Sequence, residues 1–153
     1  MELNNALEKL AELQKKLYAY HTAAAALHLD GDTVAPKGTA EGRGVALGVL
    51  AGERHKLFSA PEVGELLDFL WDKKDELDRS VRRQTEELRR SYAQLTRIPA
   101  DEYMEYAMLT NEASDVWHRA KEASDFELFR PVLERLVAFN LKLAGYYDSA
   151  KAP

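Results

Sequence analysis

Apolar side chains recur at steps of three and four residues along nearly the whole chain, and no window alternates strictly between apolar and polar side chains. Steps of three and four place residues on one face of an α-helix, whereas strict alternation would indicate a β-strand. The pattern therefore predicts an all-α fold of about six helices. We expect short connections to join them into an antiparallel, bundle-like helical array that forms a single domain over residues 1–153.

The first two predicted helices are joined by a loop rich in helix-breaking residues. The first runs from about Leu3 to about Leu27, and its small residues 23–26 indicate close packing near its end. Asp30-Gly31-Asp32 is expected to break the pattern before a loop at 35–38. The second helix, from about Thr39 to Phe58, carries glycine at every fourth position, 44, 48 and 52. Because each glycine costs about 1 kcal/mol relative to alanine in a helix, we expect this stripe to face the backbone of a closely packed neighbouring helix.

Start and stop signals predict four further helices. Ser59-Ala60-Pro61-Glu62 is typical of a capping box with proline in the first turn, and a long helix follows from about Asp75 to about Arg97. Ile98-Pro99 ends that helix, and Pro99 opens the next. Ser124-Asp125-Phe126-Glu127 predicts a second capping box, and Pro131 predicts a short turn into the last helix. The stretch Tyr146-Tyr147-Asp148-Ser149-Ala150-Lys151-Ala152-Pro153 indicates a helix tail and the start of a linker. The apolar positions expected in the core are Val63, Leu66, Leu67, Leu70, Leu77, Val81, Leu88, Tyr92, Leu95, Leu133, Leu136, Val137, Leu143 and either Asn140 or Leu141.

Composition and charge exclude several classes of protein. The 153 residues are 46% hydrophobic and 31% charged, which is typical of a soluble globular domain and excludes a disordered tail. The net charge is −5 with bases scattered among acids, so we expect neither nucleic acid nor a membrane surface as a partner. No apolar run approaches the roughly 20 residues that span a bilayer, and the N-terminus lacks the pattern of a secretion signal. The absence of cysteine removes disulfides and thiolate chemistry, and it fits a cytoplasmic location.

The histidines do not show the spacing of metal ligands. His21 and His28 share one helix face, but two turns separate them by about 10 Å, too far for one metal ion without a ligand from elsewhere in the fold. His55 and His118 stand alone in the sequence. Surface or core-edge histidines are the simpler interpretation. We therefore predict no catalytic, cofactor-binding or metal-ligating residue in this chain.

Three other patterns resemble binding motifs only superficially. Asp30, Asp32 and Glu41 fall at positions of a calcium loop, but Ala35 stands where its sharp-turn glycine belongs, so an Asp-rich turn is the better interpretation. The glycines from Gly42 onward lack the spacing of a dinucleotide fingerprint and a preceding strand, which disfavours phosphate binding. Aromatic residues at helical spacing indicate core packing rather than a cofactor site; they are Tyr18, Tyr20, Trp71, Tyr92, Tyr103, Tyr106 and Trp117.

The order of several motifs resembles a known family. Arg97-Ile98-Pro99-Ala100-Asp101-Glu102 joins two helices, and Trp117-His118-Arg119-Ala120, Ser124-Asp125-Phe126 and Phe129-Arg130-Pro131 follow it. Together with the loop and helix at 35–43, this order is similar to the N-terminal helical region of the thermostable (Taq-type) zinc metallocarboxypeptidases. The resemblance covers most of the chain from about Thr33 onward. Enzymes of that family hold zinc in a His-Glu-x-x-His motif far downstream of this region, and no such motif occurs in this sequence.

The resemblance implies a piece of a hydrolase that removes C-terminal residues from peptides through a metal-activated water. Zinc would belong to the parent enzyme, and this chain alone is expected to be inactive. Its helices would form a wall of the substrate groove that limits which peptides enter. The expected partners are therefore the remainder of the parent peptidase chain and, in the parent, a peptide substrate.

Two other hypotheses remain open. A stand-alone helical interaction module would bind a protein partner through the glycine stripe or the first helix. An independent enzyme would use His21, His28 or an acid pair. Both the peptidase-piece and the interaction-module hypotheses leave an apolar surface uncovered in this chain, and a homodimer of the isolated chain is compatible with both.

Overall fold

The computed structural model describes residues 1–148, which hold six α-helices, one 3-10 turn and no strand. The predicted all-α fold is therefore confirmed, and so is the number of helices. The helix tail expected from Tyr146 is helical as far as Asp148, and the rest of the stretch expected to begin a linker, 149–153, lies outside the described residues. The helices are α1 (Leu3–Thr33), α2 (Ala40–Ser59), α3 (Pro61–Asp72), α4 (Arg79–Leu95), α5 (Ala100–Ala123) and α6 (Phe126–Asp148), with the 3-10 turn at Lys74–Glu76.

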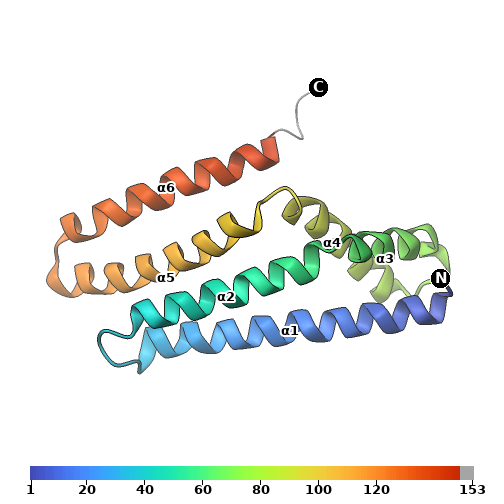
Figure 1. Ribbon diagram of the computed structural model, residues 1–153, viewed down its shortest axis with the longest axis horizontal. Coiled ribbons are helices and arrows are strands. Elements are labelled where there is room, and N and C mark those ends of the chain that lie inside the picture. The colour runs from blue at the N-terminus through green and yellow to red at the C-terminus, as the bar shows by residue number, and fades with distance from the viewer. Residues whose placement is uncertain (149–153) are drawn as a thin grey trace.

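The four long helices lie in a row (Figure 1). α1, α2, α5 and α6 stand side by side in that order, each antiparallel to its neighbour, and α3 and α4 pack at the end of the row near the N-terminus. α2 packs against both α1 and α5, whereas α6 packs mainly against α5. None of the helices in residues 1–148 combines the length and the hydropathy that crossing a membrane requires.

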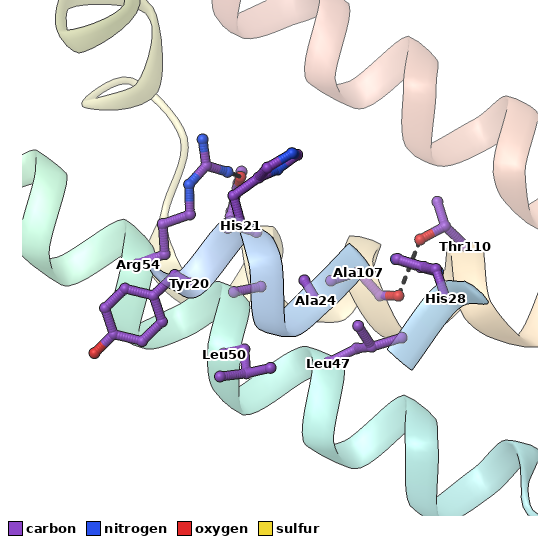
Figure 2. Close-up of a pocket in the computed structure, with 11 residues that line it drawn as sticks. Tyr20, His21, Ala24, His28, Leu47, Leu50, Arg54, Ala107 and Thr110 are labelled. Carbon is purple, nitrogen blue, oxygen red and sulfur yellow. Dashed lines mark hydrogen bonds between the residues drawn. The ribbon is translucent and has the colours of Figure 1, made fainter. Parts of the chain in front are cut away.

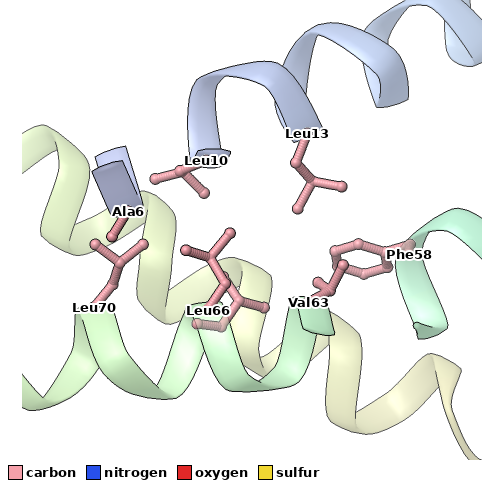
Figure 3. Close-up of a cluster of buried hydrophobic side chains, with 8 residues drawn as sticks. Ala6, Leu10, Leu13, Phe58, Val63, Leu66 and Leu70 are labelled. Carbon is pink, nitrogen blue, oxygen red and sulfur yellow. The ribbon is translucent and has the colours of Figure 1, made fainter. Parts of the chain in front are cut away.

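The larger hydrophobic core lies where α1 meets α3 and the end of α2 (Figure 3). The four α3 residues predicted to face the core are all buried, which confirms the helical spacing read from the sequence. Half-buried apolar side chains of α4 cover this cluster. A second, smaller core joins α5 to α6. The first core contains Ala6, Leu10, Leu13, Phe58, Val63, Leu66, Leu67 and Leu70; the second contains Leu109, Ala113, Val132 and Phe139.

α1 is longer than predicted, because Asp30-Gly31-Asp32 is helical. The reason lies in the packing of α1 on α2. The guanidinium of Arg43 lies against Gly31, where a Cβ atom would come 2.5 Å from Arg43 Cζ. Gly31 therefore makes room for Arg43 and does not end the helix. The alanines at 23–26 were expected to pack closely, but most of them are exposed, and Ala24 alone among these four is half-buried.

Both predicted capping boxes are wrong. Ser59 is the last residue of α2, and α3 begins at Pro61 without a side-chain cap. Ser124 ends α5 in the left-handed conformation, with φ 53°. Asp125 caps α6 instead, because its Oδ1 accepts the backbone N–H of Glu127 at 2.9 Å. The motifs located the two helix starts, but neither serine caps its helix: α3 has no side-chain cap, and Asp125 caps α6.

Two predicted boundaries in the second half of the chain also differ. α4 begins at Arg79 and not near Asp75, because the 3-10 turn and an extended Leu77 come before it. Pro131 does not mark a turn, since α6 runs through it as one helix. Pro131 is exposed, so the backbone hydrogen bond that its ring removes is lost on the solvent side of the helix.

α6 buries fewer of its apolar residues than predicted. Val132 and Phe139 are buried, whereas the predicted core residue Val137 is 52% exposed. Of the two alternatives at the next position, Asn140 is exposed and Leu141 is 70% exposed. The reason is that α5 is the main helix packed against α6, so a narrow stripe of α6 is covered.

The glycine stripe of α2 faces α5. Gly44, Gly48 and Gly52 are buried, as a closely packed neighbour requires. A Cβ atom at Gly48 would lie 2.8 Å from Met108 Cγ, and one at Gly52 would lie 2.5 Å from Met104 Sδ. The close approach of a neighbouring helix is confirmed, although the atoms nearest to the stripe belong to side chains of α5 and not to its backbone.

Candidate functional site

A cavity of about 110 Å³ lies between α1, α2 and α5. It exists because each of the three helices places a small side chain there: Ala24, Ala51 and Ala107. Leu47 and Leu50 complete the apolar part of its lining (Figure 2). The cavity is somewhat smaller than the apolar cavity of about 150 Å³ that holds benzene in a well-studied engineered protein. It can therefore take a small aliphatic group.

The rim of the cavity is polar and includes no acid among its described lining residues. Figure 2 shows His21 and Arg54 at one end of the cavity and His28 and Thr110 at the other. The hydroxyl of Thr110 donates to the backbone carbonyl of Ala107 at 2.9 Å. Among the lining residues that the structure describes, Arg54 alone is charged at every ordinary pH. The lining is therefore apolar between the three helices and carries a cation at one end.

Arg54 is held in place through a chain of contacts. Its Nη1 donates to the hydroxyl oxygen of Tyr103 at 3.0 Å, and the Tyr103 ring lies against His55 with ring centroids 5.2 Å apart. His55 is buried, and its Nε2 donates to the backbone carbonyl of Ile98 at 2.8 Å. Because a carbonyl only accepts, this bond places the proton of the imidazole on Nε2. His55 is therefore a structural residue that ties the start of α5 to α2.

A second, larger hollow of about 590 Å³ lies at the far end of α1, beside the loop that leads into α2. Arg43 Nε donates to Asn111 Oδ1 at 3.0 Å, and the buried Asn111 donates in turn to the carbonyl of Ala40 at 2.9 Å. Asp32 accepts a hydrogen bond from Ser114 at 3.2 Å. Acids and bases both line this hollow, so its charges favour neither an anion nor a cation.

The calcium-like spacing does not form a loop. Asp30 and Asp32 lie in α1, and Glu41 lies in the first turn of α2. The Asp-rich turn expected there is wrong as well, because the backbone carbonyl of Asp30 accepts the N–H of Val34 and so continues the helical pattern.

The described residues do not fit a zinc site. Zinc in proteins takes three or four ligands from histidine, cysteine or carboxylate side chains. No three such side chains gather around one point in residues 1–148. His21 and His28 line opposite ends of the cavity, and His118 Nδ1 contacts the carbonyl of Ser114 at 2.9 Å. We therefore assign no step of metal chemistry to this part of the chain.

The aromatic residues divide into two groups. Tyr20, Trp71, Tyr92, Tyr103 and Tyr106 are half-buried, in keeping with packing roles. Tyr18 and Trp117 are 71% and 43% exposed, so the prediction that they pack in the core is wrong. Tyr18 lies in α1 and Trp117 lies in α5.

Arg54 was missed by reasoning from the sequence. Its signal is present, because Arg54 lies three residues after Ala51 and four after Leu50, which in turn lie four and three residues after Leu47, so the four share a helix face. What the sequence could not supply is the pair of helices, α1 and α5, that closes the cavity around it.

The comparisons with known proteins agree with this helical arrangement. Residues 9–153 match the family described as carboxypeptidase Taq (M32) metallopeptidase. The chain belongs to that family of metallopeptidases, which confirms the resemblance read from the motifs.

The relatives are much longer than this chain. Carboxypeptidase 1 of Bacillus subtilis (strain 168) is 32% identical over 153 residues, which are 100% of this chain and 30% of that protein. The crystal structure of BsuCP is 32% identical with a TM-score of 0.90, covering 93% of this chain and 29% of that chain. An M32 carboxypeptidase from Deinococcus radiodurans R1 is 29% identical with a TM-score of 0.70, covering 95% of this chain and 29% of that one. The chain therefore spans about 30% of the length of these relatives.

Proposed function

We propose that this chain is the N-terminal helical domain of a zinc-dependent carboxypeptidase that removes C-terminal residues from peptides. In this proposal the helices form a wall of the substrate groove, and the zinc ligands and catalytic groups lie in the remaining part of the enzyme. The observation that carries the proposal is the family match over residues 9–153 of a sequence without a His-Glu-x-x-His motif.

The large accessible surface of the chain supports a role as one part of a larger folded protein. The accessible surface of the chain is 10173 Å², about 30% more than the 7,800 Å² or so expected of a compact monomer of 17.3 kDa. The row of helices favours a large surface, because a single row buries each helix only along its flanks.

Apolar side chains are exposed on every helix of the row. A stable domain normally packs a second layer of elements over such surfaces. In the proposed enzyme the remaining part of the chain would supply that layer, and the groove would lie between the two. The exposed residues include Leu29 of α1, Val45 and Val49 of α2, Trp117 of α5, and Val137 and Leu141 of α6.

The test joins this chain to the part of Bacillus subtilis Carboxypeptidase 1 that it does not match. The chain alone, the remaining part alone and the joined protein are assayed with zinc against peptides of increasing length. We expect hydrolysis from the joined protein and none from this chain. The groove-wall role fails if the remaining part folds and cleaves the same peptides equally well without these helices.

A matched pair of substitutions tests which surface is covered. Leu141→Glu places a charge on the exposed apolar face of α6, and Gln94→Glu places the same charge on an exposed polar position of α4. If α6 faces the rest of the enzyme, Leu141→Glu lowers the yield of folded, active joined protein, because a buried unpaired charge is strongly unfavourable. Gln94→Glu should leave that yield unchanged.

The same exposed apolar side chains favour a second candidate function, a stand-alone interaction module. Such a module would bind a protein partner, or a second copy of itself, through the uncovered face. Its test is the solution mass of the isolated chain together with binding of a hydrophobic dye. A monomer that binds no dye would count against this candidate.

A further inference from the structure

The cavity between α1, α2 and α5 combines three features that together select a ligand. Its lining includes Ala24, Ala51 and Ala107, the side chain of Arg54 lies at one end, and no acid is among its described lining residues. We propose that this cavity binds a carboxylate that carries a short branched aliphatic group. The carboxylate pairs with Arg54, and the aliphatic group lies among the three alanines.

The state of Arg54 supports a carboxylate. In residues 1–148 Arg54 has no ion pair, and its hydrogen bond goes to the neutral hydroxyl of Tyr103. Tyr103 rests on the buried His55, so the guanidinium is positioned before any ligand arrives. Guanidinium and carboxylate form paired, charge-assisted hydrogen bonds, which are stronger than bonds between neutral groups.

The size and lining of the cavity limit the rest of the ligand. A volume of about 110 Å³ is smaller than the space that holds a benzene ring, so the aliphatic group is limited to a few carbon atoms. A free amino acid is a poor ligand, because its ammonium group would lie near the Arg54 guanidinium with no acid among the described lining residues to pair with it. Two kinds of ligand therefore carry a carboxylate and a branched aliphatic group without an ammonium group. One is a free branched-chain acid, and the other is the last residue of a peptide, whose nitrogen is an uncharged amide.

The site is independent of the proposed peptidase role, since it requires neither a metal nor the remaining part of the enzyme. The experiment titrates the isotope-labelled chain with 4-methylpentanoate, N-acetyl-leucine, leucine and 4-methylpentanamide, and follows the backbone amide signals by NMR. We expect saturable shifts in α1, α2 and α5 with a Kd on the order of 1 mM, the range usual for a ligand of this size. The uncharged amide and the zwitterionic leucine should each bind about tenfold more weakly.

Three variants complete the test. Arg54→Gln removes the charge at an exposed position and should weaken both acids about tenfold, while Arg90→Gln removes a charge from exposed α4 and should change nothing. Ala51→Leu fills the cavity and should abolish binding.

Tighter binding of N-acetyl-leucine than of 4-methylpentanoate identifies a peptide end as the source of the carboxylate, and the reverse identifies a free acid. The proposal is overturned if neither acid gives saturable shifts, if the amide binds as well as the acid, or if Arg54→Gln and Arg90→Gln behave alike.

Discussion

Substitution of Gly52 by alanine tests the packing of α2 against α5. Alanine stabilises a helix by about 0.5 to 1 kcal/mol relative to glycine. At Gly52 the new Cβ would lie 2.5 Å from Met104 Sδ and 2.8 Å from Met104 Cγ, far inside the ordinary contact distance of about 3.5 to 4 Å. Met104 is flexible, but it is already packed on the stripe and must move by about 1 Å. Overpacking of this kind costs about 1 to 3 kcal/mol, so we expect a net loss of about 1 kcal/mol.

Gly42 provides the matched control, because it lies in the same helix with nothing within 4 Å of the position of its Cβ. Gly42→Ala should raise the free energy of unfolding by about 0.5 to 1 kcal/mol. The two variants should therefore differ by about 1.5 to 2 kcal/mol, or about 3 to 8 °C in Tm for a chain of this length. Urea and thermal unfolding, followed by circular dichroism, measure both quantities.

A third variant identifies the cause. Met104→Ala removes the obstructing atoms, so in that background Gly52→Ala should stabilise the chain as Gly42→Ala does. The reasoning is refuted if Gly52→Ala stabilises the unaltered chain as much as Gly42→Ala, or if Met104→Ala leaves the effect of Gly52→Ala unchanged.

Three further predictions concern the cores and the helix ends. Leu70→Ala should lower the free energy of unfolding by about 2 to 5 kcal/mol in urea unfolding, because Leu70 is completely buried. Asp125→Ala should cost about 1 kcal/mol in the same assay through loss of the cap on α6, and a normal value for this variant would exclude that role. The hydrogen bond from Tyr146 to the carboxylate of Glu102, aided by burial, raises the pKa of Tyr146. A raised pKa means that this contact stabilises the fold below the ordinary tyrosine value of about 10 and is lost as the pH rises through the raised value. Tyr146→Phe should therefore destabilise the chain at pH 8 and should match the unaltered chain at pH values well above 10.

The buried face of a helix was predictable from the sequence where a neighbouring helix covers the apolar stripe that the sequence pattern marks. In α3 the four predicted core residues are all buried, since α1 and α4 cover that stripe. In α6 the same reasoning failed at Val137 and Leu141, because α5 covers only a narrow stripe. The sequence states which residues are apolar, but burial also requires a neighbour, and the neighbour comes from elsewhere in the chain.

Helix ends were less predictable, because the same short motif supports caps one residue apart. Ser124-Asp125-Phe126-Glu127 contains two residues that can cap a helix, and the left-handed turn at Ser124 decides in favour of Asp125. At the end of α1, Gly31 has the propensity of a helix breaker but serves as the contact surface for Arg43. At Gly31 local preference is therefore weaker than the packing of one helix on the next.

The sequence by itself determined the all-α class, the number of helices, the close approach along the glycine stripe and the family, because helical periodicity and motif order are properties of neighbouring residues. The tertiary structure decided where α1 ends, which apolar residues of α6 stay exposed, and where a cavity opens beside Arg54. These features depend on the distances between helices that are far apart in the chain. The row of α1, α2, α5 and α6 sets those distances, and no local pattern specifies them.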